Sequence, residues 1–173
     1  MTRDNIILIG FMGSGKTRVG KEFAALQKIP VLDTDDLIVE REGMSINDIF
    51  AKKGQDYFRR AETDLIRELQ EREGRYVLSV GGGLPLREEN RPLLRKLGTV
   101  VYLKTGVKTL CARLAGDTQR PLLSGEGTLE EKIVRILTER EPKYEDAADK
   151  VLVTDGLSVK QVAEKVTGLV KRG

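Results

Sequence analysis

The sequence predicts an α/β protein in which a parallel sheet is covered by helices on both faces. Short apolar runs rich in β-branched residues alternate with longer amphipathic segments along the chain, the pattern of repeated strand–helix units. A glycine-rich turn, Gly10–Thr17, directly follows the first apolar run and precedes a helical pattern. The 173 residues have the length of one domain, so we expect residues 1–173 to form a single domain.

Five apolar runs have the length and composition of strands: Asn5–Ile9, Val31–Leu32, Tyr76–Val80, Val100–Leu103 and Val151–Val153. Valines in the third and fourth runs are typical of strands buried on both faces. Because parallel strands end at a common edge, we expect ligands to gather at their carboxyl ends.

Helices are predicted where apolar residues recur every three or four positions. Ser45 and Asp48 resemble a capping box that opens a helix through Phe50. Pro142 is expected to end the helix that precedes it. The apolar faces of the other helices are Val19, Phe23 and Leu26; Phe58, Ala61, Leu65 and Leu69; Ile133, Ile136 and Leu137; and Val159, Val162, Val166 and Leu169.

The composition excludes several classes of function. No apolar run approaches the roughly 20 residues of a membrane span, and four aliphatic residues before Gly10 are too few for a signal-peptide core. Cys111 is the one cysteine, which fits a reducing, cytoplasmic location. A net charge of +3 from interleaved charges does not indicate nucleic-acid binding. The absence of histidine excludes His-dependent hydrolysis and directs proton transfer towards carboxylates.

The glycine-rich turn fits the phosphate-binding loop, or P-loop, pattern Gly-x4-Gly-Lys-Ser/Thr. Between a strand and a helix start, its backbone N–H groups and the helix dipole favour a polyphosphate. Lys16 can reach the outer phosphates, and the Thr17 hydroxyl can ligate Mg²⁺.

Two carboxylates, Asp33 and Asp35, follow the second strand. One can hold a Mg²⁺-bound water, and the other can accept a hydrogen bond from an attacking hydroxyl. The alternative is that they only cap the next helix, where aspartate is favoured. The neighbouring phosphate loop favours the functional interpretation.

Arg59 and Glu62 share one face of a helix, where Glu62 can hold the guanidinium ready for a substrate carboxylate. A surface ion pair is the simpler alternative. Gly81-Gly82-Gly83 follows the third strand and lets a small ligand lie directly on the backbone. A tight turn is the alternative there, although it seldom needs three glycines.

A polar segment of residues 114–127 is predicted to form a mobile lid. Arg120 in the lid can reach the transferred phosphoryl group, whereas the alternative is a solvated loop charge. Arg140 is a candidate second clamp for a carboxylate, or an ordinary cation near a helix C-terminus.

Together these motifs resemble those of shikimate kinases, small enzymes similar to nucleoside monophosphate kinases. The motifs follow the family's order: GFMGSGKT, DTD, FRRAE, GGG, RPLL and REPKY. The resemblance runs from about Asn5 to the C-terminus. It implies a three-layer α/β/α P-loop kinase fold whose five parallel strands have the order 2-3-1-4-5.

The resemblance implies that ATP phosphorylates the 3-hydroxyl of shikimate, in the route to chorismate and aromatic amino acids. It implies catalytic roles for Lys16, Asp35 and Arg120, with Mg²⁺ at Thr17 and Asp33. The residues implied at the nucleotide are Gly13, Ser14, Gly15, Lys16, Thr17, Arg18, Arg113 and Arg120. The residues implied at shikimate are Asp35, Arg59, Glu62, Gly81, Gly82, Gly83 and Arg140. The first three belong to a helical substrate-binding segment of about residues 34–62, here called the acid-binding segment. We expect a monomer with no nucleic-acid or membrane partner.

Two positions depart from the family pattern. Many relatives have Ile-Glu soon after DTD, whereas here Val39 separates Ile38 from Glu40. Relatives usually have a small hydroxyl residue after Thr17, where this chain has Arg18.

Two other functions compete with shikimate phosphorylation. A gluconate kinase or nucleoside monophosphate kinase shares the architecture, although two separated arginines suit a small carboxylate better than a nucleotide acceptor. A nucleotide-binding module without catalysis predicts the loss of Lys16, Asp35 or the lid arginine, and all three are present.

Overall fold

The structure is a computed structural model that describes residues 4–117 and 120–171. Its strands are β1 (Asn5–Ile9), β2 (Val31–Asp33), β3 (Val77–Ser79), β4 (Gly98–Lys104) and β5 (Lys150–Val153). Its α-helices are α1 (Lys16–Gln27), α2 (Thr34–Glu42), α3 (Ile46–Lys53), α4 (Gln55–Glu68), α5 (Asn90–Leu97), α6 (Val107–Leu114), α7 (Leu129–Ala147) and α8 (Val159–Lys171). Short 3₁₀ turns are η1 (Leu69–Glu71), η2 (Leu84–Leu86) and η3 (Pro121–Leu123).

The strands form one parallel sheet in the order β2-β3-β1-β4-β5, which confirms the predicted fold. The central strand β1 pairs with β3 on one side and β4 on the other, so that Ile6 lies beside both Val77 and Thr99. All carboxyl ends therefore meet at one edge of the sheet. The turns after β1, β2 and β3 bring the P-loop, the DTD segment and the glycines together there.

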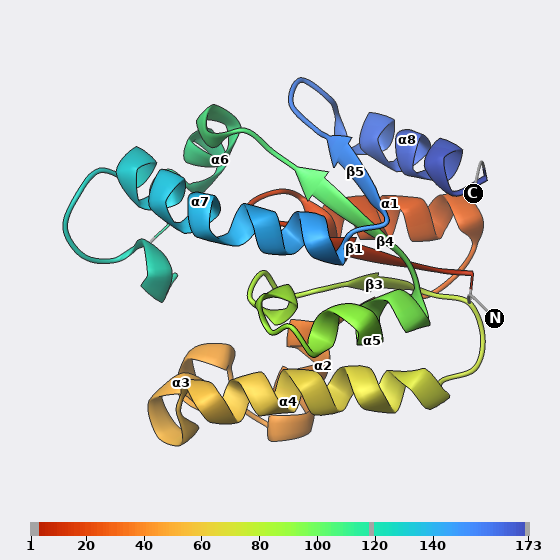
Figure 1. The fold of residues 1–173 in the computed structure, drawn as a ribbon, viewed down its shortest axis with the longest axis horizontal. Helices are drawn as coiled ribbons and strands as arrows, with labels where there is room; N and C mark the ends of the chain where they lie inside the picture. The colour runs from red at the N-terminus through yellow and green to blue at the C-terminus, as the bar shows by residue number, and fades with distance from the viewer. Residues whose placement is uncertain (1–3, 118–119, 172–173) are drawn as a thin grey trace.

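Alternate residues of β1 supply the two faces of the core. Ile6 and Leu8 face α1 and α8, whereas Ile7 and Ile9 face the cluster that includes α5 and α7 (Figure 1). All four side chains are fully buried. A strand covered by helices on both faces reads as a continuous apolar run, as the sequence predicted.

The expected helix end at Pro142 is wrong. Helix α7 continues through Pro142 to Ala147, although proline removes one backbone donor and crowds the preceding turn. The following turn holds Tyr144 and Ala147, which are both fully buried in the core. Packing of this turn outweighs the local cost of the proline.

Of two other local predictions, one is wrong and one is confirmed. Leu26 is 47% exposed and does not belong to the buried face of α1. Ser45 caps α3, because its hydroxyl accepts a hydrogen bond from the Asp48 N–H at 3.1 Å. In the two described ranges, no helix combines the length and apolar character needed to cross a membrane.

Candidate active site

The P-loop wraps around the start of α1. Gly13 and Gly15 have φ values of +79° and +91°, a left-handed conformation that favours glycine. Lys16 Nζ donates to the carbonyls of Gly10 at 2.6 Å and Phe11 at 3.2 Å, so the ammonium lies over its own loop. Burial lowers the pKa of Lys16 to about 8, against the attraction of the aspartates after β2.

The DTD segment is Asp33-Thr34-Asp35, and the two carboxylate oxygens of Asp33 have different partners. Asp33 Oδ1 accepts the N–H groups of Asp35 at 2.9 Å and Asp36 at 3.2 Å, which caps α2. Its Oδ2 accepts the hydroxyl of Thr17 at 3.2 Å. Asp33 thus caps α2, as the alternative interpretation predicted, and also contacts the threonine of the P-loop.

Asp35 enters the site from the first turn of α2. Burial raises the pKa of its carboxyl above the ordinary value, and the charge of Asp33 raises it further. Thr34, between them, is fully buried and accepts the Gly81 N–H at 2.9 Å. This bond ties the DTD segment to the glycine turn after β3.

Arg59 and Glu62 form a partly buried ion pair on α4. Arg59 Nη1 lies 2.6 Å from Glu62 Oε1, and the Glu62 side chain is 1% exposed. Burial raises the pKa of Glu62 to about 7, while attraction by Arg59 opposes the shift. Its second oxygen, Oε2, is buried and has no hydrogen-bond partner among the residues that the structure describes.

Two of the three glycines leave no room for a side chain, and the third has only ordinary contacts. A Cβ at Gly81 would lie 2.8 Å from Asp35 Oδ1, and one at Gly83 would overlap the Arg59 guanidinium. A Cβ at Gly82 would lie 3.5 Å from Arg140 Nη1. The candidate acid-binding side chains therefore converge on this bare stretch of backbone from α2, α4 and α7.

A buried network that the sequence analysis missed fixes the glycine turn to α4. The hydroxyl of Thr63 donates to Asn90 Oδ1 at 2.9 Å, and Asn90 Nδ2 donates to the Leu84 carbonyl at 2.8 Å. Thr63 follows Glu62 directly, so this network connects the arginine–glutamate pair to the end of the turn. Buried polar side chains carry no periodic signal, and only the fold reveals the pairing.

Arginines from the second half of the chain reach the P-loop and its pocket. Arg113 at the end of α6 donates to the Gly13 carbonyl at 3.0 Å. Arg120 is exposed, pairs with Asp117 at 2.9 Å and lies among the residues that line the same pocket as Lys16. The predicted lid of residues 114–127 includes positions 118 and 119, which lie outside the described residues.

Lys16 and Asp35 line one pocket of about 260 Å³ at this edge of the sheet. The lining combines the P-loop, the DTD segment, the end of β3 and the lid arginine: Met12, Gly13, Gly15, Lys16, Thr17, Arg18, Asp33, Asp35, Ser79, Val80, Gly81, Gly82 and Arg120. This lining does not include Gly83, nor Arg59, Glu62 and Arg140, which contact the glycine turn. Arg18 is at the rim, and its side chain is exposed.

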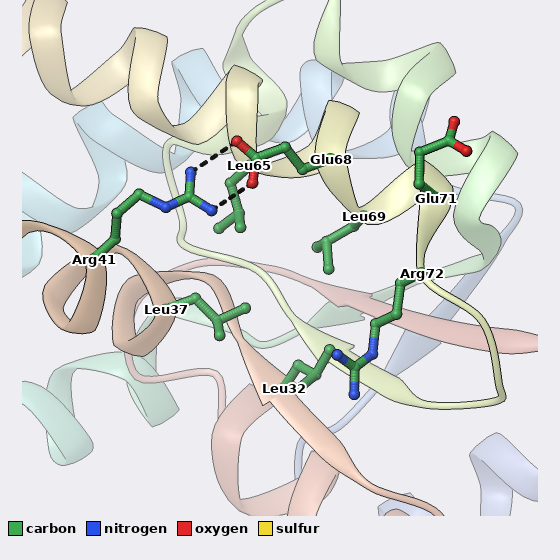
Figure 2. A pocket seen from close by; sticks show the side chains of 8 residues that line it. All are labelled: Leu32, Leu37, Arg41, Leu65, Glu68, Leu69, Glu71 and Arg72. Atoms are coloured by element: carbon green, nitrogen blue, oxygen red, sulfur yellow. Dashed lines mark hydrogen bonds and ion pairs between the residues drawn. The ribbon is translucent and has the colours of Figure 1, made fainter.

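A larger pocket of about 420 Å³ lies elsewhere, between β2, α2 and the end of α4. Figure 2 shows leucines along its floor, Leu32, Leu37, Leu65 and Leu69, with Arg41 and Glu68 paired across its rim. It has none of the P-loop residues, and two of its four charged residues, Arg41 and Glu68, pair with each other.

Thr17 and Asp33 place two oxygen donors side by side next to the P-loop. Within residues 4–117 and 120–171, no cluster of three or more His, Cys, Asp or Glu side chains could hold a metal. Mg²⁺ keeps several waters and needs only one or two protein oxygens. The donor set therefore fits Mg²⁺ and would suit zinc poorly.

Comparison with known proteins identifies the family. The shikimate kinase family model matches residues 12–171. The chain belongs to the shikimate kinase family. The shikimate kinase of Geobacter metallireducens is 45% identical over 96% of this chain and 92% of its own length, and that of Legionella pneumophila (strain Corby) is 43% identical over 94% and 91%.

Solved shikimate kinases share the fold closely. The Acinetobacter baumannii enzyme, solved in complex with shikimate, gives a TM-score of 0.91 at 37% identity, covering 99% of this chain and 94% of that one. A gluconokinase from Sinorhizobium meliloti gives 0.60 at 18% identity, covering 98% of this chain and 92% of that one, and so shares the fold alone. As a shikimate kinase family member, the chain is a phosphotransferase with a nucleotide substrate.

Proposed function

We propose that this shikimate kinase family member transfers the γ-phosphoryl group of ATP to the 3-hydroxyl of shikimate. The observation that carries the proposal is that Lys16 and Asp35 line the same pocket, with the P-loop on one side and Gly81 and Gly82 on the other. A phosphoryl donor and a hydroxyl acceptor can therefore meet between them. The A. baumannii relative, solved in complex with shikimate, supports the choice of acceptor.

On the nucleotide side, the P-loop backbone from Gly13 to Thr17 receives the phosphates. Lys16, now bonded to loop carbonyls, exchanges these partners for phosphate oxygens. Arg113 supports the loop through Gly13 and lies along the base, and Arg120 adds positive charge at the transferred group. Ser14 and Arg18 complete the nucleotide set at the turn and at the rim.

Thr17 and Asp33 would hold Mg²⁺, Thr17 directly and Asp33 through water. The metal, when bound, offsets negative charge on the phosphates. The Thr17–Asp33 contact keeps both oxygens turned towards the pocket.

On the acid side, Arg59 and Arg140 bind the carboxylate of shikimate, and Glu62 orients Arg59. The ring lies along Gly81, Gly82 and Gly83, where the absence of side chains allows close approach. Arginine is the suitable residue because its planar fork can pair with both oxygens of a carboxylate.

Asp35 aligns the attacking hydroxyl. The oxygen of that hydroxyl forms a bond to the γ-phosphorus as the bond to the ADP oxygen breaks, and its proton moves towards the Asp35 carboxylate. The raised pKa of Asp35 makes it a better proton acceptor than an exposed aspartate. Most of the acceleration comes from positioning and electrostatic stabilisation, because the transition state is loose.

We further propose that residues 1–173 act as one domain, with an acid-binding segment at about residues 34–62 and a lid at residues 114–127 that excludes water on closing. A monomeric state and a cytoplasmic location stay predictions from the sequence.

An ADP-release assay across shikimate, gluconate, AMP and CMP tests the acceptor. We expect turnover with shikimate alone. Turnover with gluconate or a nucleotide, and none with shikimate, would contradict the proposal.

Asp35→Asn and Lys16→Met should each lower kcat by about two orders of magnitude or more with the unfolding temperature retained.

Arg59→Ala and Arg140→Ala should mainly raise the KM for shikimate. The exposed neighbour Arg60 offers a matched control on the same helix, and Arg60→Ala should leave both KM values unchanged. An unchanged KM for shikimate in both clamp variants would disprove the carboxylate clamp.

A further inference from the structure

Tyr144 lies one helical turn beyond Arg140 because α7 continues past Pro142. Residues four positions apart share a helix face, and this face points towards the glycine turn. The Tyr144 side chain is fully buried, with its ring 5.2 Å from that of Tyr102 at an interplanar angle of 42°. The aromatic pair fixes the ring, so the hydroxyl has a defined position.

The hydroxyl of Tyr144 reaches into the candidate acid site. It donates to the Gly82 carbonyl at 2.6 Å. A Cβ built on Gly82 would lie 3.5 Å from Arg140 Nη1 and 3.6 Å from the Tyr144 hydroxyl oxygen. The guanidinium, the hydroxyl and the Gly82 peptide thus converge on one point.

Arg140 is buried beside an aromatic ring of the P-loop. It is 6% exposed, and its guanidinium carbon lies 6.0 Å from the centre of the Phe11 ring. No carboxylate within residues 4–117 and 120–171 forms an ion pair with Arg140, so its orientation depends on neutral neighbours. Burial raises the pKa of Tyr144, so its hydroxyl keeps the proton that it donates to Gly82.

We propose that Tyr144 is a positioning residue for the acid substrate, which holds the Gly82 peptide and the Arg140 guanidinium in the arrangement that receives the carboxylate and ring. This inference rests on the proposed function. Tyr144 would not touch the reacting atoms. It would act through a backbone carbonyl and a side chain that do contact the acid.

Tyr144→Phe tests this role because it removes one oxygen and leaves the buried ring. We expect the KM for shikimate to rise about threefold to tenfold, the range for loss of one buried hydrogen bond. The KM for ATP should stay within about twofold, because the P-loop contacts are untouched. If Tyr144 had only a structural role, Tyr144→Phe would not raise the KM for shikimate more than the KM for ATP.

Tyr102→Phe is the matched control, since it removes the same atom from the other ring of the pair while the bond to Gly82 remains. Both KM values should stay at the wild-type level. The unfolding temperature of each variant is measured alongside, and calorimetric titration with shikimate gives a second readout at a lower temperature if Tyr144→Phe is less stable.

An unchanged shikimate KM and affinity in Tyr144→Phe would overturn the inference. Equal rises in both KM values would also overturn it, since they indicate a general loss of structure. The wild-type assay separates failure of this inference from failure of the proposed function. If the wild type released no ADP with shikimate, the proposed acceptor would be wrong. If the wild type is active, the comparison with Tyr144→Phe tests the positioning role alone.

Discussion

Two residues of this site, Lys16 and Glu62, have pKa values shifted towards neutrality, because burial disfavours a charged side chain of either sign. Burial favours the neutral form, so it lowers the pKa of Lys16 to about 8 and raises that of Glu62 to about 7. Neither group is fixed in one protonation state near neutral pH. The proposed roles of these two residues therefore lead to pH effects that can be measured separately.

Binding of ATP near pH 8 should be accompanied by proton uptake at Lys16. An amine with a pKa of about 8 is about half protonated there, and phosphates next to it raise its pKa. Calorimetric titration in buffers of different ionisation enthalpy should show uptake of up to about half a proton per ATP. Lys16→Arg keeps the charge but cannot titrate in this range, and it should abolish the uptake. Equal uptake in the variant would assign the proton to another group.

Binding of shikimate should weaken as pH falls through the pKa of Glu62. The folded-state pKa is raised, so the carboxyl is protonated below about 7 and no longer attracts Arg59 as an anion. The KM for shikimate should rise up to about tenfold from about pH 8 to about pH 6. Glu62→Gln still accepts a hydrogen bond but has no charge to lose, so its KM should be nearly independent of pH. A parallel rise in the variant would place the titrating group elsewhere, with Asp35 as the next candidate.

At the scale of helices and strands, the sequence predicted features that depend on adjacent residues, but not those that depend on contacts between elements. The strands, the P-loop and the Ser45 cap follow from adjacent residues, and the structure confirms them. The end of α7 could not be predicted, because Pro142 opposes the helix locally while the packing of Tyr144 requires it. The contact between Tyr144 and Gly82 spans 62 positions of sequence, which no local pattern encodes.

The α6 helix provides a second case of support from a distant segment. Its N-cap, Gly106, has no side chain, and Asp155 after β5 takes that role: its carboxylate accepts the Gly106 N–H at 3.0 Å and the Thr109 hydroxyl at 2.7 Å. The other end of α6 carries Arg113, which donates to Gly13 in the P-loop. Asp155 is therefore connected through α6 to the P-loop, the proposed nucleotide side.

Asp155→Ala should raise the KM for ATP about threefold to tenfold, in line with the loss of a helix cap, and leave that for shikimate unchanged. Asp155→Asn should retain the wild-type value, since asparagine caps helices as well as aspartate. Asp149 is the control: it accepts the Val100 N–H at 2.8 Å, at the opposite end of the same two strands. If Asp149→Ala raised the KM for ATP as much, the effect would be general destabilisation.

At the scale of the whole molecule, the parallel sheet determines where chemistry can occur. The alternation of strands and helices predicted the parallel arrangement, and family resemblance supplied the order of strands. Neither indicated how side chains from α2, α4 and α7 would fit around Gly81–Gly83, because this depends on distances between elements. A second pocket lies beside β2 (Figure 2). It is larger than the pocket at the P-loop, but it holds none of the candidate catalytic residues.

Two Arg–Glu pairs that involve α4 allow these pockets to be compared directly: one links α2 to α4, and the other lies within α4. Arg41–Glu68 and Arg59–Glu62 both have an N–O distance of 2.6 Å. The first pair is 42% and 60% exposed at the rim of the larger pocket, whereas the second is 17% and 1% exposed at the glycine turn. Water screens the first pair, so its contribution to stability should be below about 1 kcal/mol. The second pair leaves a buried carboxylate uncompensated when its arginine is removed.

Arg41→Ala should therefore change neither KM value and lower the free energy of unfolding by less than about 1 kcal/mol in a urea titration. Arg59→Ala should raise the KM for shikimate at least about tenfold, since it removes a charged partner of the acid. It should also destabilise the fold more at pH 8 than at about pH 6, because Glu62 left alone can take up a proton at the lower pH and no longer carries an unpaired charge. A rise in the shikimate KM of Arg41→Ala similar to that of Arg59→Ala would contradict the acid site at the glycine turn and assign acid binding to the larger pocket.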